Sequence, residues 1–216
     1  MKKFISGLAA LFMVASLAAV AGAAGSGSSC NGVNTTNGWT ITAVPESQTV
    51  YVTVEGTSGD DVFNADYDEL TNSYPLVITG LGGDDTICGG GFDDEIYGGD
   101  GDDWLDGEQG DDYIEGNDDD DYIEGGTDDD EVRGGAGVDE VRGQSGNDTV
   151  RGGSGTDLLY GHSGDDDLDG NSGNNDLVYD GSGSDDVRGG TGTGDYCDAQ
   201  DAGDTIDASC EFYFNF

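Results

Sequence analysis

The chain has 216 residues and is strongly acidic, with 47 aspartates and glutamates against six lysines and arginines and a formal net charge of −41. This charge excludes nucleic acid as a partner, because a polyanion is repelled by such a surface. Only 34% of the residues are hydrophobic. The chain is therefore either an acidic disordered segment or a fold that needs a source of stability besides apolar burial.

Residues 1–23 are predicted to be a secretory signal. Lys2 and Lys3 precede an apolar run at 4–20, and the sequence A-G-A at 21–23 offers a cleavage site. The alternatives are a membrane anchor and a lipoprotein acylated at Cys30. With the signal removed, we expect a secreted, extracellular chain without a transmembrane segment, either free or associated with the cell surface.

Residues 24–79 are predicted to be an N-terminal β cap. Strands are expected at 39–44 and 49–55, where Val50, Val52 and Val54 alternate with polar residues. A degenerate nine-residue unit follows at 56–64, and residues 65–79 then interrupt the period. A cap of this kind covers the apolar side chains that the first coil of a repeat fold exposes.

Residues 80–178 repeat one nine-residue phrase eleven times without a break, and residues 98–106, GGDGDDWLD, are the clearest copy. We number its places positions 1 to 9. Position 1 is always Gly and position 8 is always Ile, Leu or Val; position 6 is Asp in every copy but the eleventh, which has Asn175. A fixed short period predicts a solenoid whose units stack to bury a shared face.

The residue types of the repeat indicate how each unit folds. Glycines at positions 1, 2 and 4 permit a tight turn, and positions 7 to 9 form a short strand whose middle residue points to the opposite side from its neighbours. Position 8 therefore faces a narrow core. Two units make one coil, so that each copy stacks on the copy two places further along the chain.

The motif G-G-x-G-x-D-x-U-x resembles the RTX family of haemolysin-type calcium-binding repeats. The resemblance implies an all-β fold, a right-handed parallel β-roll solenoid of stacked nonapeptide pairs with short β caps. It also implies calcium ions held between stacked turns by the Asp at position 6 of both turns. It does not carry the toxin activity of some family members.

Stacking places the position-6 aspartates in two rows at a spacing of about 5 Å, where bare carboxylates repel. Oxygen ligands select Ca²⁺ over softer metals. Five aspartates in each row leave four spaces, which predicts about eight well-formed calcium sites in the two rows. The predicted ligands are Asp85, Asp103, Asp121, Asp139 and Asp157 in one row and Asp94, Asp112, Asp130, Asp148 and Asp166 in the other, with Asp61 and Asp185 from degenerate copies.

The period is expected to slip by one residue at Tyr179, after which two weaker copies follow at 180–188 and 189–197. Gly194 stands where the second of these should have Asp, so weak binding is expected there. The array is thus assigned to residues 80–197 and a C-terminal cap to 198–216.

Four cysteines in an exported chain predict two disulfides, for which three pairings are possible. Cys197 with Cys210 is favoured, because it would hold the C-terminal cap with a short loop and because RTX-like chains show a similar ending. Cys30 with Cys88 is then left, and a free Cys88 is the alternative.

The sequence offers no catalytic constellation, and the chain is predicted not to be an enzyme. His162 is the only histidine, and neither G-x-S-x-G nor H-E-x-x-H occurs. The expected function is a secreted calcium-binding protein with a structural or adhesive role. The alternative is a calcium-dependent module that binds an extracellular glycan or surface protein.

The alternative function depends on the outward positions. Position 7 stacks Trp104 beside Tyr122, which form either a cross-strand ladder or an exposed contact patch. Position 9 predicts weak stacked ion pairs, which involve Glu115, Arg133, Arg151 and Asp169 on one face and Glu124 and Arg142 on the other.

Overall fold

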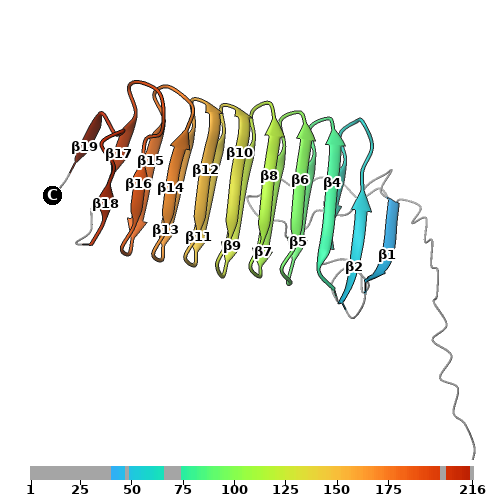
Figure 1. The fold of residues 1–216 in the computed structure, drawn as a ribbon. Helices are drawn as coiled ribbons and strands as arrows, with labels where there is room; N and C mark the ends of the chain where they lie inside the picture. Colours follow the sequence, from blue (N-terminus) through green and yellow to red (C-terminus); the bar gives the residue numbers. More distant parts are fainter. Residues whose placement is uncertain (1–39, 47–48, 66–73, 200–202, 215–216) are drawn as a thin grey trace, which may run out of the picture.

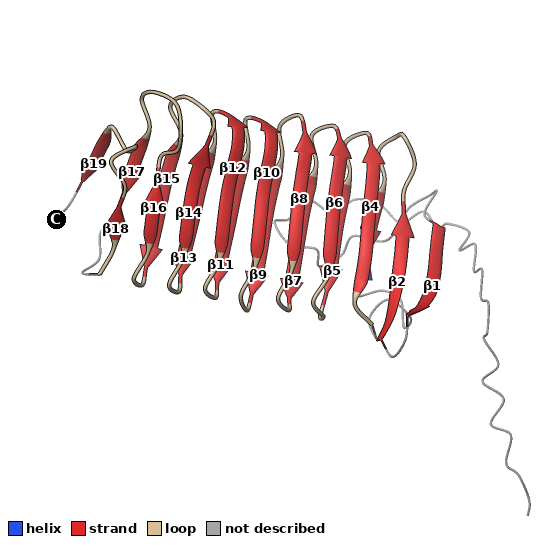
Figure 2. Ribbon diagram, in the orientation of Figure 1, coloured by secondary structure: helices blue, strands red, loops and turns tan. Residues whose placement is uncertain are grey.

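The structure is a computed structural model, and it describes residues 40–46, 49–65, 74–199 and 203–214. These residues form a β-solenoid in which successive strands, from the second onward, alternate between two sheets (Figure 1). Figure 2 shows strands joined by short turns, and none of the described residues forms a helix long and apolar enough to cross a membrane. The all-β parallel solenoid predicted from the repeat is confirmed.

The ten-stranded sheet contains, in spatial order, β1 (Thr40–Glu46), β2 (Thr49–Glu55), β4 (Leu76–Gly82), β6 (Glu95–Asp100), β8 (Tyr113–Asp118), β10 (Glu131–Gly137), β12 (Thr149–Gly155), β14 (Asp167–Asn171), β16 (Asp186–Arg188) and β18 (Thr205–Ile206). The nine-stranded sheet contains, in chain order, β3 (Val62–Asn64), β5 (Thr86–Gly90), β7 (Trp104–Gln109), β9 (Tyr122–Thr127), β11 (Glu140–Ser145), β13 (Leu158–Ser163), β15 (Leu177–Ser182), β17 (Tyr196–Asp198) and β19 (Phe212–Phe214). All neighbours pair in parallel except β1 and β2.

The core of the array is a file of position-8 side chains from each sheet. Ile96 lies beside Ile114, the residue 18 places later, and both are fully buried. The other buried position-8 residues include Ile87, Leu105, Ile123, Val132, Val141, Val150, Leu159 and Leu168. Burying each such side chain stabilises the fold by about 1.5–3 kcal/mol. Because the core is thin, the total stabilisation from apolar burial is modest.

The first strands continue the sheets at the N-terminal end. Strand β2 pairs with β4, and β1 adds an antiparallel edge strand. The degenerate unit at 56–64 folds as part of the solenoid, because Phe63 is buried in the position-8 file and Val62 pairs with Thr86. Leu76 occupies the place of the position-6 Asp and Ile78 that of position 8. The period therefore resumes inside the stretch expected to interrupt it.

The predicted slip at Tyr179 is wrong, because the extra residue lies earlier, in the turn before β15. Leu158 pairs with Leu177 and Leu159 with Val178, so Val178 is buried at position 8 while Leu177 is 38% exposed at position 7. Asp176 therefore takes position 6, and Asn175 stands in the turn with φ of 63°. Turns absorb an inserted residue, whereas a shift of the strand would reverse which side chains face the core.

The same correction applies to the copy at 189–197. Val178 pairs with Cys197, and Asp195 is buried at position 6, where its Oδ1 accepts a hydrogen bond from the backbone N–H of Asp176. Gly194 therefore does not occupy the carboxylate place. The two ten-residue copies stack on one another, so both insertions fall in the same part of the turn.

The predicted Cys197–Cys210 disulfide is confirmed, with a Cα–Cα distance of 5.7 Å and 13 residues of separation. Cys88 is also disulfide-bonded. Its predicted partner, Cys30, and the predicted signal at 1–23 both lie outside the described residues.

Candidate metal centre

Each of the two turn sides of the solenoid carries one row of aspartates, all buried except the half-buried Asp204. The backbone N–H of each member but the last donates a hydrogen bond of 2.7–3.2 Å to Oδ1 of the aspartate on the following coil. The first row is Asp61, Asp85, Asp103, Asp121, Asp139, Asp157, Asp176 and Asp195. The second row is Asp94, Asp112, Asp130, Asp148, Asp166, Asp185 and Asp204. All the predicted ligands lie in these rows; Asp176, Asp195 and Asp204 were missed.

The second carboxylate oxygen of the array aspartates is buried and unsatisfied. Oδ2 of Asp121, for example, has no hydrogen-bond partner. The same holds for Oδ2 of Asp85, Asp94, Asp103, Asp112, Asp130, Asp139, Asp148, Asp157, Asp166 and Asp176. Burying a charged oxygen without a partner is costly, so a whole row of them indicates a ligand such as a cation.

Asp61, at the start of the first row, differs from the array. Its Oδ2 accepts hydrogen bonds from the backbone N–H of Thr57 at 2.7 Å and from the Thr57 hydroxyl at 2.9 Å. This oxygen is therefore already satisfied, which makes Asp61 a poorer ligand than the aspartates of the array.

The glycine at position 1 makes room for the unsatisfied oxygen. A Cβ added to Gly116 would lie 2.1 Å from Oδ2 of Asp121 and 2.6 Å from the carbonyl oxygen of Gly134 on the next coil. A carboxylate of one coil and a carbonyl of the next therefore converge beside this glycine. Calcium prefers hard oxygen ligands of these two kinds, so the donor set fits Ca²⁺.

Burial raises the pKa values of the row aspartates from Asp85 to Asp166 above the ordinary value. It raises the pKa of Asp112 to about 9 and that of Asp121 to about 8. The backbone N–H bonded to each carboxylate opposes this shift, and neighbouring carboxylates in the row add to it. Without a cation these carboxylates resist ionisation at neutral pH, and a bound divalent cation reverses that preference.

A second, exposed set of carboxylates at position 5 was also missed. The backbone N–H of Asp102 donates to Oδ1 of Asp84 at 3.2 Å, which is the opposite direction to the position-6 rows. Asp93 accepts in the same way from Asp111, and Asp111 from Asp129. The doubled Asp-Asp of many copies is the sequence signal. These side chains bind the backbone of the next coil and add negative charge around the turns.

The comparison with known families supports calcium as the ligand. The family model for the RTX calcium-binding nonapeptide repeat matches in four copies, at residues 79–114, 107–141, 115–150 and 142–177. Residues 79–177 are an RTX repeat array. No curated protein matches the chain. RTX repeats bind calcium, their β-roll is generally structural and not catalytic, and the proteins that carry them are typically extracellular. This array is therefore a calcium-binding structural element.

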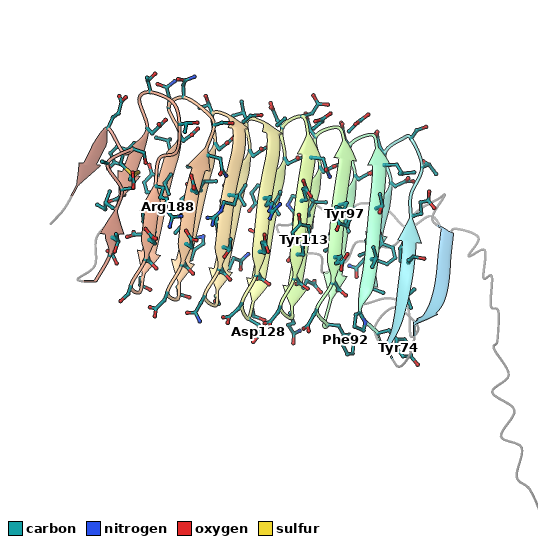
Figure 3. The ribbon with its side chains drawn as sticks, viewed as in Figure 1. Tyr74, Phe92, Tyr97, Tyr113, Asp128 and Arg188 are labelled. Atoms are coloured by element: carbon teal, nitrogen blue, oxygen red, sulfur yellow. A yellow bond between two sulfur atoms is a disulfide. The ribbon has the colours of Figure 1, made fainter. Side chains whose placement is uncertain are left out.

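The outward faces carry aromatic and arginine ladders. Trp104 and Tyr122 stack with ring centroids 6.2 Å apart and planes 4° apart, and both are half-buried. The guanidinium of Arg142 lies 5.1 Å from the Tyr122 ring centroid and 5.3 Å from that of Tyr160. The cross-strand ladder predicted for Trp104 and Tyr122 is therefore present. Figure 3 shows a diagonal aromatic pair on the other sheet, Tyr97 at position 9 of one strand and Tyr113 at position 7 of the next.

The predicted ion pairs are only partly correct. Arg142 pairs with Glu124 on the neighbouring strand at 3.5 Å, as expected, and also with Glu140. Arg133 instead pairs with Glu131 of its own strand. Arg151 binds Asp167 and not the stacked Asp169. The reason is that positions 7 and 9 of one strand lie on the same face, so the acid at position 7 competes with the stacked one.

Proposed function

We propose that the chain is a secreted calcium-binding β-roll, non-enzymatic, with a structural or adhesive role outside the cell. The row aspartates from Asp85 to Asp166 are the proposed ligands, with Asp61 and Asp185 near the ends. The proposed organisation is a signal at 1–23, a cap at 24–79, the roll at 80–197 and a C-terminal cap at 198–216. The buried, unpartnered Oδ2 atoms carry this proposal.

Calcium would supply free energy that the thin core lacks. Without it, each row brings buried carboxylates together with nothing to offset their charge. Ions between coils convert this repulsion into attraction, so binding free energy becomes folding free energy. Extracellular calcium modules typically bind with dissociation constants of about 10⁻⁴ to 10⁻³ M, which suits a protein that folds only after export.

Circular dichroism of the purified chain, with calcium chelated and then restored, tests the proposal. We expect a weak, disordered spectrum under chelation and a cooperative return of the β signal with Ca²⁺. Mg²⁺ should restore it poorly, because this smaller ion demands octahedral geometry and retains its waters. A β spectrum that persists unchanged under full chelation would contradict calcium-driven folding.

A second candidate is a calcium-dependent module for a glycan or surface protein. The observation that favours it is the ring stack of Trp104 and Tyr122, continued by Arg142 and Tyr160 across neighbouring strands. Against it, these rings and the guanidinium already pack against one another. Replacing Trp104 and Tyr122 by Ala separates the two functions: loss of binding to an extracellular glycan or protein with calcium-induced folding intact would favour the module.

A further inference from the structure

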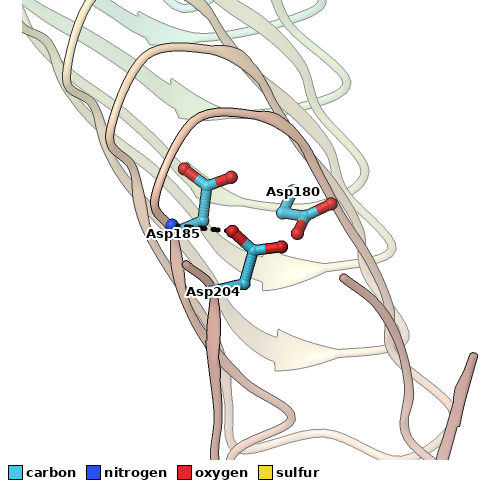
Figure 4. A group of neighbouring side chains, drawn as sticks. All are labelled: Asp180, Asp185 and Asp204. Carbon is cyan, nitrogen blue, oxygen red and sulfur yellow. Dashed lines mark hydrogen bonds between the residues drawn. The ribbon is translucent and has the colours of Figure 1, made fainter. Parts of the chain in front are cut away.

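The last turn of the second row departs from the array at position 1. In all eleven copies at 80–178 this position is Gly, because a Cβ would meet Oδ2 of the position-6 Asp of the same copy. In the copy at 180–188 it is Asp180. Its carboxylate joins those of Asp185 and Asp204, and one oxygen atom of each lies within 4.8 Å of the others (Figure 4).

Asp180 is held in place but left with an unsatisfied oxygen. Its side chain is only 1% exposed, and its Oδ1 accepts a hydrogen bond of 2.7 Å from the N–H of Gly181. Its Oδ2 is buried and has no hydrogen-bond partner. Figure 4 shows one oxygen of this carboxylate next to the carboxylate of Asp204. A buried anionic oxygen close to two more carboxylates is a donor set that fits a cation.

The three carboxylates come from separate parts of the chain. Asp180 lies in β15, Asp185 precedes β16, and Asp204 precedes β18. Asp204 also belongs to the loop closed by the Cys197–Cys210 disulfide, and its Oδ1 accepts from the N–H of Asp185 at 3.2 Å. An ion at this point would therefore fasten the disulfide loop to the roll.

Resting on the proposed calcium-binding roll, we infer that Asp180 adds a third carboxylate to the last space of the second row, between Asp185 and Asp204, and makes it a terminal site for a hard divalent cation, Ca²⁺, which locks the last coil onto the array. The site differs from the array sites because a third carboxylate replaces the position-1 glycine. It also lies outside residues 79–177, which the family model matches. Three carboxylate ligands place more negative charge on one ion than a pair does, and calcium affinity increases with ligand charge.

The test compares the full oxidised chain with Asp180→Asn, which keeps the side chain's size, and Asp180→Gly, which restores the array residue. Native mass spectrometry counts bound calcium, and hydrogen exchange follows residues 203–211. The matched control is Asp186→Asn. Asp186 lies beside the site, but its carboxylate pairs with Arg188, so the variant removes one negative charge without removing a proposed ligand. We expect both Asp180 variants to fill the last site and to protect 203–211 only at calcium concentrations several-fold higher than in wild type, because each leaves the site with one charge fewer, while the control matches wild type.

Protection of residues 103–157 provides an internal reference for folding of the array. If both Asp180 variants fill the last site and protect 203–211 at the wild-type calcium concentration, the role of Asp180 as a third ligand is refuted. If calcium protects neither segment of the wild-type chain, the proposed calcium-driven roll fails as well. A shift at 203–211 to higher calcium concentration, with 103–157 unchanged, supports the terminal site specifically.

Discussion

The backbone N–H of Asp103 donates a hydrogen bond of 2.9 Å to Oδ1 of Asp121 on the next coil. One carboxylate oxygen thus pins the neighbouring coil, while Oδ2 of the same group stays buried and unpartnered. These different surroundings explain why Asp recurs at this position. One oxygen holds the neighbouring coil, and the other is placed to bind a cation.

Replacing Asp121 by Asn tests these two roles at mid-array. The amide keeps an Oδ1 acceptor for Asp103 and places an N–H₂ donor near the carbonyl of Gly134, so the calcium-free chain should be no less stable. Two calcium spaces lose a charge, however. We expect the calcium midpoint of folding to rise by about tenfold, which corresponds to about 1.4 kcal/mol. A calcium titration followed by circular dichroism measures it.

The matched control for this variant is Asp102→Asn. Asp102 is an exposed carboxylate at position 5 of the preceding coil. The amide likewise preserves its Oδ1 acceptor for the N–H of Asp120. Its calcium midpoint should stay within about twofold of wild type, because exposed charges are screened. Equal shifts for the two variants would mean that overall charge, and not ligation, sets the midpoint.

Calcium-free stability should depend on pH in the direction opposite to that of the calcium-loaded chain. Burial raises the pKa of Asp112 to about 9, and Asp94, Asp130 and Asp93 raise it further. A pKa above the unfolded value of about 3.9 means that the folded state holds its proton more tightly. The stability that this provides is complete below about pH 4 and is lost as the pH rises through about 9.

Thermal melts monitored by circular dichroism at several pH values measure this effect. With a chelator present, where the chain is expected to be disordered at about pH 8, acidification to about pH 5 should restore part of the β signal and a thermal transition. With calcium present, the same acidification should lower the melting temperature, because protons compete with the ion for the same carboxylates. The same direction in both conditions would argue against calcium ligation by the rows.

Gly116→Ala tests the need for glycine at position 1. Its Cβ would lie 2.1 Å from Oδ2 of Asp121, so the carboxylate must move. We expect a loss of about 1–3 kcal/mol in unfolding free energy, as for overpacking, together with weaker calcium binding. Gly59→Ala is the control, because its Cβ meets nothing within 4 Å. Denaturant titrations in calcium compare the two.

Much of the fold could be predicted because the same nine-residue pattern recurs eleven times. The Ile at position 8, as in Ile114, recurs at the period of the coil, and a half-buried three-residue strand has only one way to face the core. The two Asp rows followed from the same period. The structure adds the part that the period does not encode, which is the direction of the hydrogen bonds between coils.

The C-terminal end could not be predicted from the period alone. Counting from Gly170 puts Asn175 at position 6, whereas pairing of the strands puts Asp176 there. Counting from the Asp-x-U triplet before the strand would have found it. Asp204 follows Asp185 by 19 residues, and the residues just before it, AQDAG at 199–203, lack the glycines of positions 1, 2 and 4, so only the folded chain brings it to Asp180.

The register at this end gives a sharp prediction for Asn175 and Asp176. Asn175 lies in the turn with a left-handed φ of 63°, and its N–H donates to the carbonyl of Thr193 at 3.0 Å. Asp176 is fully buried, and its Oδ1 accepts from the N–H of Asp157. Asn175→Asp should therefore leave calcium binding unchanged, although the unbroken period would have it restore a ligand.

Asp176→Asn should instead weaken calcium binding at this end, because it removes the charge from the row while keeping the hydrogen bond to Asp157. Hydrogen exchange during a calcium titration reads the effect locally. We expect β15 and β17 to become protected only at calcium concentrations several-fold higher than in wild type, with β9 unaffected. The opposite result would be tighter calcium binding in Asn175→Asp and unchanged calcium binding in Asp176→Asn. It would show that the extra residue lies after β15 and that the register described above is wrong.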